Sequence, residues 1–431
     1  MSIRDLIIFA VIFGSLPFCF TRPWIGVLVF SWIGYMNPHR FTWGMAYDFP
    51  FAQIIAIATL AGFIFTKDKE KFYMERETIL IILLWIIFTI TTFSAFYPDK
   101  AKEMLAKTSK IFLMCLITIP LFIDRKKLRY LLLTSALSLG FLGIKGGIFS
   151  IATAGAYNVR GPEGSFIGGE GDFALALNMT LPLLFYLAKD EENKKLKFIL
   201  NFAFVLSLLS VIFTYRRGAF LGLAAVIFML LLKSNKKLIG VTVLSVGLVI
   251  GSYLVTEKWT ERMGTIKTYE EDASAMGRIN AWKMAWNVAK DRPLMGSGFD
   301  GLTGGTADKY SPNPDATAGD IHSIYFEILG EHGFIAFGLF ISLLMSTYLS
   351  LNKLKKTFND NPSYKWICNY ADMLQVSIIA YMIGGTFLGR AYFDLFYHLV
   401  VIAVILKVLA RNELSLSTNN EFLAISKTAK I

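Results

Sequence analysis

The sequence has few of the residues that build disulfide frameworks, structural zinc sites or soluble surfaces. Its 431 residues include three cysteines, and each lies alone in or beside an apolar segment. Isolated cysteines exclude a disulfide framework and a zinc site with cysteine pairs. Only 17% of the residues are charged and 55% are hydrophobic, whereas soluble domains have about 25% charged residues. The composition therefore excludes an ordinary soluble domain.

Several motifs of well-known enzymes and transporters are also missing. The chain contains no P-loop, no HExxH, no GxSxG and no carboxylate pair at glycosidase-like spacing. It shows no repeat of fixed period and no inverted halves, which many secondary transporters have. The net charge of +11 comes from short basic clusters between apolar runs, a pattern that fits an anionic membrane leaflet better than nucleic acid.

The most abundant feature is the apolar run, because about 20 residues of helix cross a bilayer. Apolar segments occur at 5–20, 23–37, 49–66, 78–96, 104–123, 130–150, 171–188, 198–214, 218–232, 238–255, 322–350, 370–388 and 391–408. We predict an all-α, polytopic transmembrane bundle of about 12–13 spans that forms one integral membrane domain over 1–431. Pro17 and Pro23 leave open whether residues 5–37 cross once or twice.

Lysine and arginine in the short loops predict the orientation. Basic clusters near 67–76, 125–129, 189–197, 233–237 and 353–365 alternate along the chain, and such loops are cytoplasmic. The long polar interval 256–321 then faces the periplasm of a bacterial inner membrane, and we expect it to contain short helices. The tail 412–431 is predicted to be cytoplasmic and disordered. Since the rest is mostly apolar helix, this polar interval and its re-entry up to Ala336 are expected to hold the functional site.

A first candidate site is the outward helix junction Thr214-Tyr215-Arg216-Arg217-Gly218. Two arginines are unexpected at an outward junction, because lysine and arginine are enriched in cytoplasmic loops. Guanidinium groups suit phosphate oxygens. The alternative is that both arginines reach to lipid headgroups. Arg160, in a glycine-rich outward loop with Glu170 and Asp172, is a weaker candidate for sugar or phosphate contact.

A second candidate lies in the long loop. Ile279, Trp282 and Trp286 fall at helical spacing, which predicts an amphipathic helix resting on the membrane interface or on neighbouring spans. Arg278 would lie in its first turn, beside backbone N–H groups that favour anions. The alternative for Arg278 is a solvated side chain on a surface helix.

The third candidate is His322, directly before the next apolar run. Imidazole titrates near neutral pH, which suits a general base. His332 lies roughly 15 Å further along a helix and on another face, so the two histidines do not form a metal pair; we expect His332 to be a hydrogen-bonded packing residue. Lys145 lies inside a span, where a charge is usually functional or reaches outward to the interface. Arg390 and Asp394 flank the last outward turn and are expected to pair.

These motifs resemble the O-antigen ligase and O-antigen polymerase superfamily of bacterial membrane glycosyltransferases. The resemblance covers residues 200–340 most strongly. His322-Ser323 followed by Gly333 matches the ligase motif, with Ala336 as a departure, and TYRRGAFLGL is similar to the Ser-Arg-Gly element, with Arg216 in place of serine. SAMGRINAW, DRPLMGSGF and HSIYFEILGEHGF are most similar to the exosortase A-associated O-glycosylation ligases.

The resemblance implies glycan transfer from an undecaprenyl diphosphate carrier to an acceptor hydroxyl on the periplasmic face. Arg217 and Arg278 would bind the pyrophosphate, with Arg216 and Arg160 as weaker candidates, and His322 would be the catalytic base. Attack opposite the diphosphate predicts inversion, and we expect neither a metal nor a cofactor. The acceptor stays open between a lipid A-core sugar, another glycan and protein Ser or Thr. A polymerase, a protein O-glycosyl ligase and a lipid-linked glycan flippase or transporter remain alternatives.

Overall fold

The computed structural model describes residues 2–233, 273–316 and 319–428, and every regular element in these ranges is helical. This confirms the predicted all-α membrane bundle. The first half contains α1 (Ile3–Thr21), α2 (Pro23–Met36), η1 (Pro38–Phe41), α3 (Phe51–Phe65), α4 (Arg76–Thr92), α5 (Pro98–Leu121), α6 (Arg125–Ala152), α7 (Glu170–Asp190), α8 (Lys194–Ile212) and α9 (Arg217–Leu232). The second half contains α12 (Ala273–Asp291), α13 (Thr306–Tyr310), η2 (Pro314–Ala316), α14 (Ile324–Phe358), η3 (Pro362–Tyr364), α15 (Lys365–Gly384), η4 (Gly385–Phe387) and α16 (Asp394–Thr428).

Within the described ranges, seven helical segments are long and apolar enough to cross a membrane, and α2, α3 and α9 are shorter apolar helices. Each predicted apolar segment coincides with a helix, apart from 238–255, which lies outside the described residues. The long interval contains short helices as expected, in α12, α13 and η2. The apolar runs therefore located these helices, although α14 and α16 extend beyond their predicted ends at 350 and 408.

The amino-terminal helices α1 and α2 form an antiparallel pair. Arg22 alone separates them, and the start of α1 lies beside the segment that follows α2. Arg4 donates to the carbonyl oxygen of Phe41 at 3.1 Å, and its guanidinium lies 4.2 Å from the Trp43 ring centroid. Residues 5–37 therefore pass through the bundle twice, and Pro23 begins the second pass instead of bending a single one.

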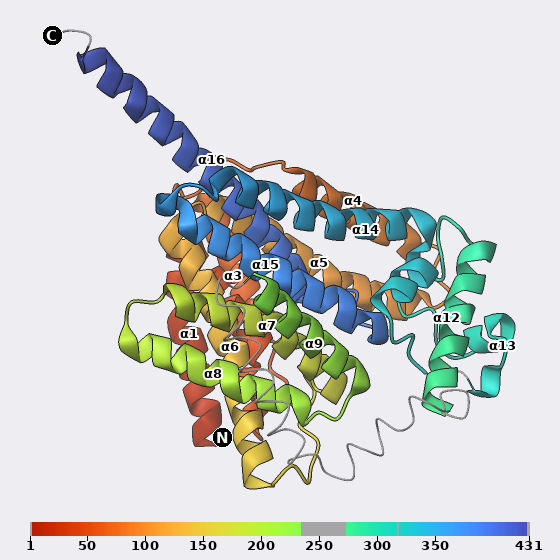
Figure 1. Cartoon of the computed structure of the whole chain (residues 1–431). Helices are drawn as coiled ribbons and strands as arrows, with labels where there is room; N and C mark the ends of the chain where they lie inside the picture. The colour runs from red at the N-terminus through yellow and green to blue at the C-terminus, as the bar shows by residue number, and fades with distance from the viewer. Residues whose placement is uncertain (1, 234–272, 317–318, 429–431) are drawn as a thin grey trace.

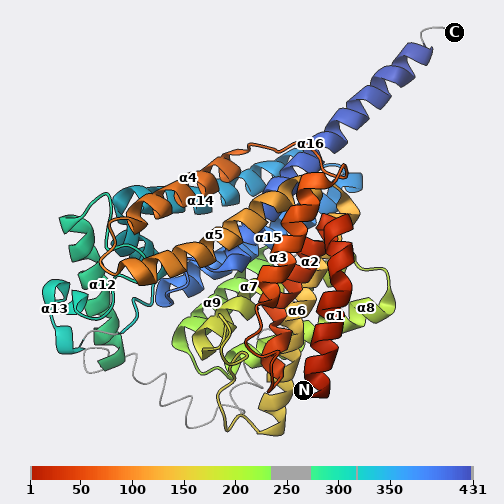
Figure 2. The ribbon, with the colours of Figure 1, turned by 180° about the vertical axis from the view of Figure 1, so that it is seen from behind.

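The interior of the bundle is built by α7, α15 and the first half of α16. Side chains along α7 are buried over nearly its whole length, and α7 packs against α6, α8, α9 and α15. Figures 1 and 2 show α4, α5 and α14 grouped on one side of these helices and α1, α2, α3 and α6 on the other. Since α7 has 21 residues, its ends lie about 30 Å apart at 1.5 Å per residue.

One end of the bundle collects the basic loops, and we call it the basic end. Ion pairs there join segments that are distant in sequence: Lys127 to Asp68 at 2.9 Å, and Lys233 to Asp372 at 2.6 Å. The opposite end, the pocket end, holds the starts of α7 and α9, at Glu170 and Arg217. The sorting of basic loops to one end agrees with the alternation in the sequence.

A break at Gly333 divides α14. This glycine has φ +77° and ψ −174°, outside the helical range. The break frees the carbonyl groups of Gly330 and Glu331, which accept from the backbone N–H groups of Ser297 at 2.9 Å and Gly298 at 2.8 Å. A side chain on Gly333 would lie 2.4 Å from the Pro293 carbonyl oxygen. The segment after α12 therefore locks into the broken turn of α14.

The carboxyl-terminal segment differs from the expectation of a disordered tail. α16 continues as helix to Thr428, whereas a tail without regular structure was expected from residue 412. From Asp394 onward the sequence contains neither glycine nor proline, and these are the residues that commonly end a helix. Nothing in the local sequence therefore stops α16 where its apolar run ends.

Candidate functional site

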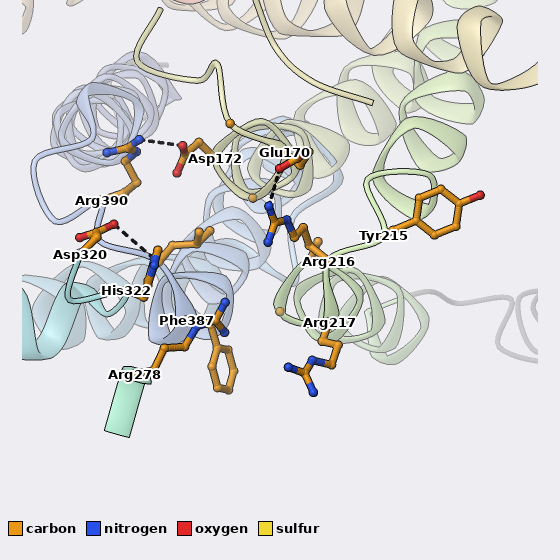
Figure 3. Close-up of a pocket in the computed structure, with 15 residues that line it drawn as sticks. Glu170, Asp172, Tyr215, Arg216, Arg217, Arg278, Asp320, His322, Phe387 and Arg390 are labelled. Atoms are coloured by element: carbon orange, nitrogen blue, oxygen red, sulfur yellow. Dashed lines mark hydrogen bonds and ion pairs between the residues drawn. The ribbon is translucent and has the colours of Figure 1, made fainter. Parts of the chain in front are cut away.

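A cavity of about 260 Å³ opens at the pocket end (Figure 3). Four chain segments contribute to it: the start of α7, the α8–α9 turn with the start of α9, the α12 and pre-α14 region, and the turn after α15. Its lining is Gly169, Glu170, Gly171, Asp172, Tyr215, Arg216, Arg217, Gly218, Ala219, Arg278, Asp320, His322, Phe387, Leu388 and Arg390. Arg216, Arg217, Arg278 and His322, which are far apart in sequence, thus lie in one cavity, as expected for their positions.

Two helix N-termini line this cavity. The first residues of α7 and of α9 both contribute to its wall. A helix N-terminus exposes unsatisfied N–H groups and has a partial positive charge, so it favours an anion. Asn178 in α7 donates to the carbonyl oxygen of Ala219 at 2.9 Å, which fixes the two helix starts relative to each other. The backbone therefore adds positive potential to that of the arginines.

Arg216 and Arg217 belong to a tight turn between α8 and α9. Tyr215 adopts φ +54°, a left-handed conformation, and its hydroxyl donates to the Gly155 carbonyl oxygen at 2.5 Å. Left-handed backbone is costly for a non-glycine residue, so the tyrosine anchor holds the turn in place. Figure 3 shows the Tyr215 ring directed away from both arginines. Arg217 then starts α9 with a half-buried side chain at the cavity wall.

Glu170 holds Arg216 and Arg160 with its two carboxylate oxygens. Oε2 accepts from Arg216 at 2.5 Å, and Oε1 accepts from Arg160 at 2.8 Å. The carboxylate is buried, so this charge is compensated by the two guanidinium groups. Arg160 lines a neighbouring cavity and touches the present one through Glu170. Of the four arginines singled out from the sequence, it is the one set apart.

Arg278 enters from α12, in the second turn of that helix. We expected it in the first turn, but α12 already includes Ala273, five residues earlier, at the edge of the described range. The apolar stripe of α12 packs on α14, where Trp282 stacks on Phe326 with ring centroids 5.3 Å apart. The Trp282 indole N–H also donates to the Ile321 carbonyl oxygen at 2.9 Å. One helix face therefore fixes Arg278 relative to the residue before His322.

His322 lies between Arg278 and Asp320. Its backbone has φ +49°, and its Nδ1 is 3.2 Å from an Asp320 carboxylate oxygen. Burial lowers the pKa of His322 from its ordinary value of 6.5; Arg278 also lowers it and Asp320 opposes the shift. The imidazole is therefore neutral at neutral pH. With Nδ1–H directed to Asp320, Nε2 keeps a lone pair that can accept a proton.

Several partners of these residues were not predicted. Arg390 pairs with Asp172 at 2.7 Å, so the expected pairing of Arg390 with Asp394 is wrong. Asp394 begins α16 and lines a different cavity, with Tyr35 and His398. Asp320 lies two positions before His322 in the sequence and could have been singled out. Asp172 and Arg390 are 218 positions apart, and local pattern gives no signal for such a pair.

His332 is a packing residue, as expected. It is fully buried, with Nδ1 2.6 Å from the Thr91 hydroxyl and Nε2 2.8 Å from the Tyr392 hydroxyl. Tyr392 also donates to Glu331 at 2.5 Å, and Glu331 accepts from the Asp300 backbone N–H at 2.8 Å. Over the described ranges, no three His, Cys, Asp or Glu side chains gather as a metal-binding group.

Comparison with known proteins divides the chain into two parts. Residues 202–341 match a family model described as O-antigen ligase. Residues 3–192 match a family of unknown function, DUF5935. No curated protein matches the chain. The first match spans Arg216, Arg217, Arg278 and His322, whereas Glu170 and Asp172 lie in the second match and Arg390 lies outside both.

Proposed function

We propose that this chain transfers a glycan from undecaprenyl diphosphate to an acceptor hydroxyl at the periplasmic face. The match of residues 202–341 to the O-antigen ligase family model supports this proposal. Membership in this superfamily suggests a glycosyl-transferring membrane enzyme. The main support for the finer statement is that Arg217, Arg278 and His322 line one cavity. The branch most similar in its motifs, the exosortase A-associated O-glycosylation ligases, is our proposal for its subtype.

In this mechanism Arg217 and Arg278 bind the pyrophosphate, with Arg216 beside them. Each guanidinium offers several N–H donors in a planar fork that matches phosphate oxygens. The N-termini of α7 and α9 add to this positive potential. Negative charge grows on the leaving diphosphate as the glycosidic bond breaks, so fixed cations stabilise the transition state more than the ground state. Arg160 contributes indirectly, through Glu170.

His322 acts as the general base. The Asp320 carboxylate, 3.2 Å from Nδ1, orients the ring, so Nε2 takes the proton from the acceptor hydroxyl. The acceptor oxygen forms a bond to the anomeric carbon, and the bond from that carbon to the diphosphate oxygen breaks. The diphosphate leaves with the electron pair. Attack from the side opposite the leaving group inverts the anomeric configuration.

The test is reconstitution of the purified protein in liposomes with lipid diphosphate-linked glycan and candidate acceptors. Mass spectrometry should detect a new glycosidic bond and released undecaprenyl diphosphate, and both should require His322, Arg217 and Arg278. Glycan chains lengthened on the carrier would identify a polymerase instead. Movement of labelled lipid-linked glycan across the bilayer without a new bond would overturn the proposal in favour of a flippase. Full transfer by His322→Ala, Arg217→Ala and Arg278→Ala at normal protein level would also overturn it.

A further inference from the structure

A second cavity, of about 270 Å³, lies next to the first on the far side of Glu170. Its volume is several times the ~30 Å³ that one water takes in the liquid. The wall combines two cations, Lys145 and Arg160, with apolar side chains. Its lining is Phe41, Leu142, Lys145, Gly146, Phe149, Asn158, Val159, Arg160, Gly161, Pro162 and Phe173. Such a lining suits an amphiphile with an anionic head.

Lys145 occupies an unusual position for a charge. It lies within α6, one of the candidate membrane spans, about 10 Å from the end of that helix at Ala152 by the helical rise. Its ammonium group is 4.3 Å from the Phe41 ring centroid. A charge at this depth is costly and is usually retained for a ligand or pathway. An anion in the cavity would compensate it.

Arg160 supplies the second cation at the outer rim. Its guanidinium contacts Glu170, yet its side chain stays 68% exposed, so part of its donor fork remains accessible to a ligand. The loop that holds it is fixed, because the Val159 backbone N–H donates to the Phe213 carbonyl oxygen at 3.0 Å. Lys145 from a helix and Arg160 from a fixed loop thus flank one space.

The same face of α6 also presents exposed apolar side chains. Phe141, Ile148 and Phe149 are 45%, 51% and 42% exposed, and their spacing of four, three and four residues from Lys145 places them on one helix face. In a membrane span this face meets acyl chains. By the helical rise, Phe141 lies about 6 Å deeper in the span than Lys145, whereas Ile148 and Phe149 lie about 5–6 Å nearer the Ala152 end. Two cations set in this apolar surface match the build of a phospholipid better than that of a free phosphate.

We infer that this cavity binds the headgroup of an anionic bilayer phospholipid, with its phosphate between Lys145 and Arg160, its glycerol region beside Ile148 and Phe149, and its acyl chains running past Phe141 into the bilayer. The site is separate from the transfer cavity and does not depend on glycan transfer. The two cavities share one carboxylate, since Glu170 accepts from Arg160 on one side and from Arg216 on the other.

The test is native mass spectrometry of the full-length protein in mild detergent, titrated with phosphatidylglycerol or with zwitterionic phosphatidylcholine. The wild type should retain phosphatidylglycerol preferentially. Lys145→Gln and Arg160→Gln should each weaken retention by about tenfold or more, because each loses a charge-assisted hydrogen bond. Lys145→Arg, which keeps the charge, should retain the lipid and shows that changes at this position still give folded protein.

Two matched controls locate the site. Lys102→Gln removes an exposed lysine from the start of α5, and Arg278→Gln removes a cation from the transfer cavity; neither should change phosphatidylglycerol retention. Equal retention of both lipids, or unchanged retention in Lys145→Gln and Arg160→Gln, would overturn the inference. Loss of retention in Arg278→Gln would place the lipid in the transfer cavity instead. Displacement by glycerol 3-phosphate as effective as that by the lipid would overturn the role of the acyl chains.

Discussion

The two ends of the bundle both have cavities lined with charged residues, yet their chemistry differs. The cavity at the basic end is larger, about 470 Å³ against about 260 Å³. There the buried carboxylate of Glu77 accepts from Lys407 at 2.7 Å and from Ser350, so cation and anion compensate each other. At the pocket end, two helix N-termini and a histidine–carboxylate pair join the arginines. Cavity size therefore does not identify the site, whereas the kind of charge around it does.

The largest effect on transfer is expected from removal of His322, which tests whether the two ends differ in function. His322→Ala should lower transfer about 10²–10⁴-fold, because the acceptor hydroxyl loses its base. Arg76→Gln, at the wall of the opposite cavity, should leave transfer unchanged. Rates of product formation per folded protein in liposomes measure both. Equal losses in the two variants would mean that the ends do not differ in function.

The next largest losses of transfer rate are expected from substitution of the arginines. Arg217→Gln and Arg278→Gln should each lower transfer about 10²–10³-fold, since a fixed cation is lost where charge develops. Arg217→Lys should recover only part of the rate, because an ammonium group lacks the planar fork. Arg411→Gln at the opposite cavity is the matched control. A wild-type rate in both Arg217→Gln and Arg278→Gln would remove the electrostatic basis of the mechanism.

A smaller effect is expected from Trp282. Trp282→Phe keeps a ring against Phe326 but removes the N–H donor to the Ile321 carbonyl oxygen. Losing one such hydrogen bond corresponds to about a two- to tenfold lower rate. Trp286→Phe, in which a ring still packs on Phe334, should be near wild type. Single-turnover kinetics should show the loss in the transfer step and not in donor binding; an equal loss in Trp286→Phe would contradict this role.

The pH dependence of the transfer rate gives a further test of the chemistry at the pocket end. In the proposed mechanism, transfer needs neutral His322. The pKa of His322 lies below its ordinary value of 6.5, so the rate should hold at neutral pH and fall only on acidification past this lowered pKa. Arg278→Gln removes a cation that disfavours protonation, so the acid limb should move to higher pH. Asp320→Asn removes an anion, so the limb should move to lower pH. Each shift should be less than about one unit, because solvent screens part-exposed charges.

Shifts of the acid limb in the same direction for Arg278→Gln and Asp320→Asn would contradict His322 as the titrating base.

The smallest effect on transfer is expected at the basic end. Glu77→Gln should lower the melting temperature without changing the rate per folded protein. Lys407 keeps Glu75 at 3.0 Å, so the loss should stay below the roughly 3–5 kcal/mol of a fully unpaired buried charge.

The sequence predicted the spans well because each apolar run must satisfy its own backbone hydrogen bonds as a helix. It also identified Arg217, Arg278 and His322 as residues that share one cavity. It could not predict their carboxylate partners: Glu170 is 46 positions from Arg216, and such contacts depend on how α7 packs against α9. The break at Gly333 was not predicted either: Gly330 and Gly333 are visible in the sequence, but a glycine inside a helical pattern is often tolerated without a break.

The break at Gly333 also has a consequence for how the protein meets its bilayer. Membranes differ in thickness, and a span adjusts to them by tilting or shifting. In α14 the segment after Gly333 carries the long apolar stretch, whereas the segment before it is hydrogen-bonded to Ser297 and Gly298 and leads from His322. We expect the backbone at this glycine to take up the tilt of the longer segment. The histidine can therefore keep its depth and orientation while the membrane around the protein changes.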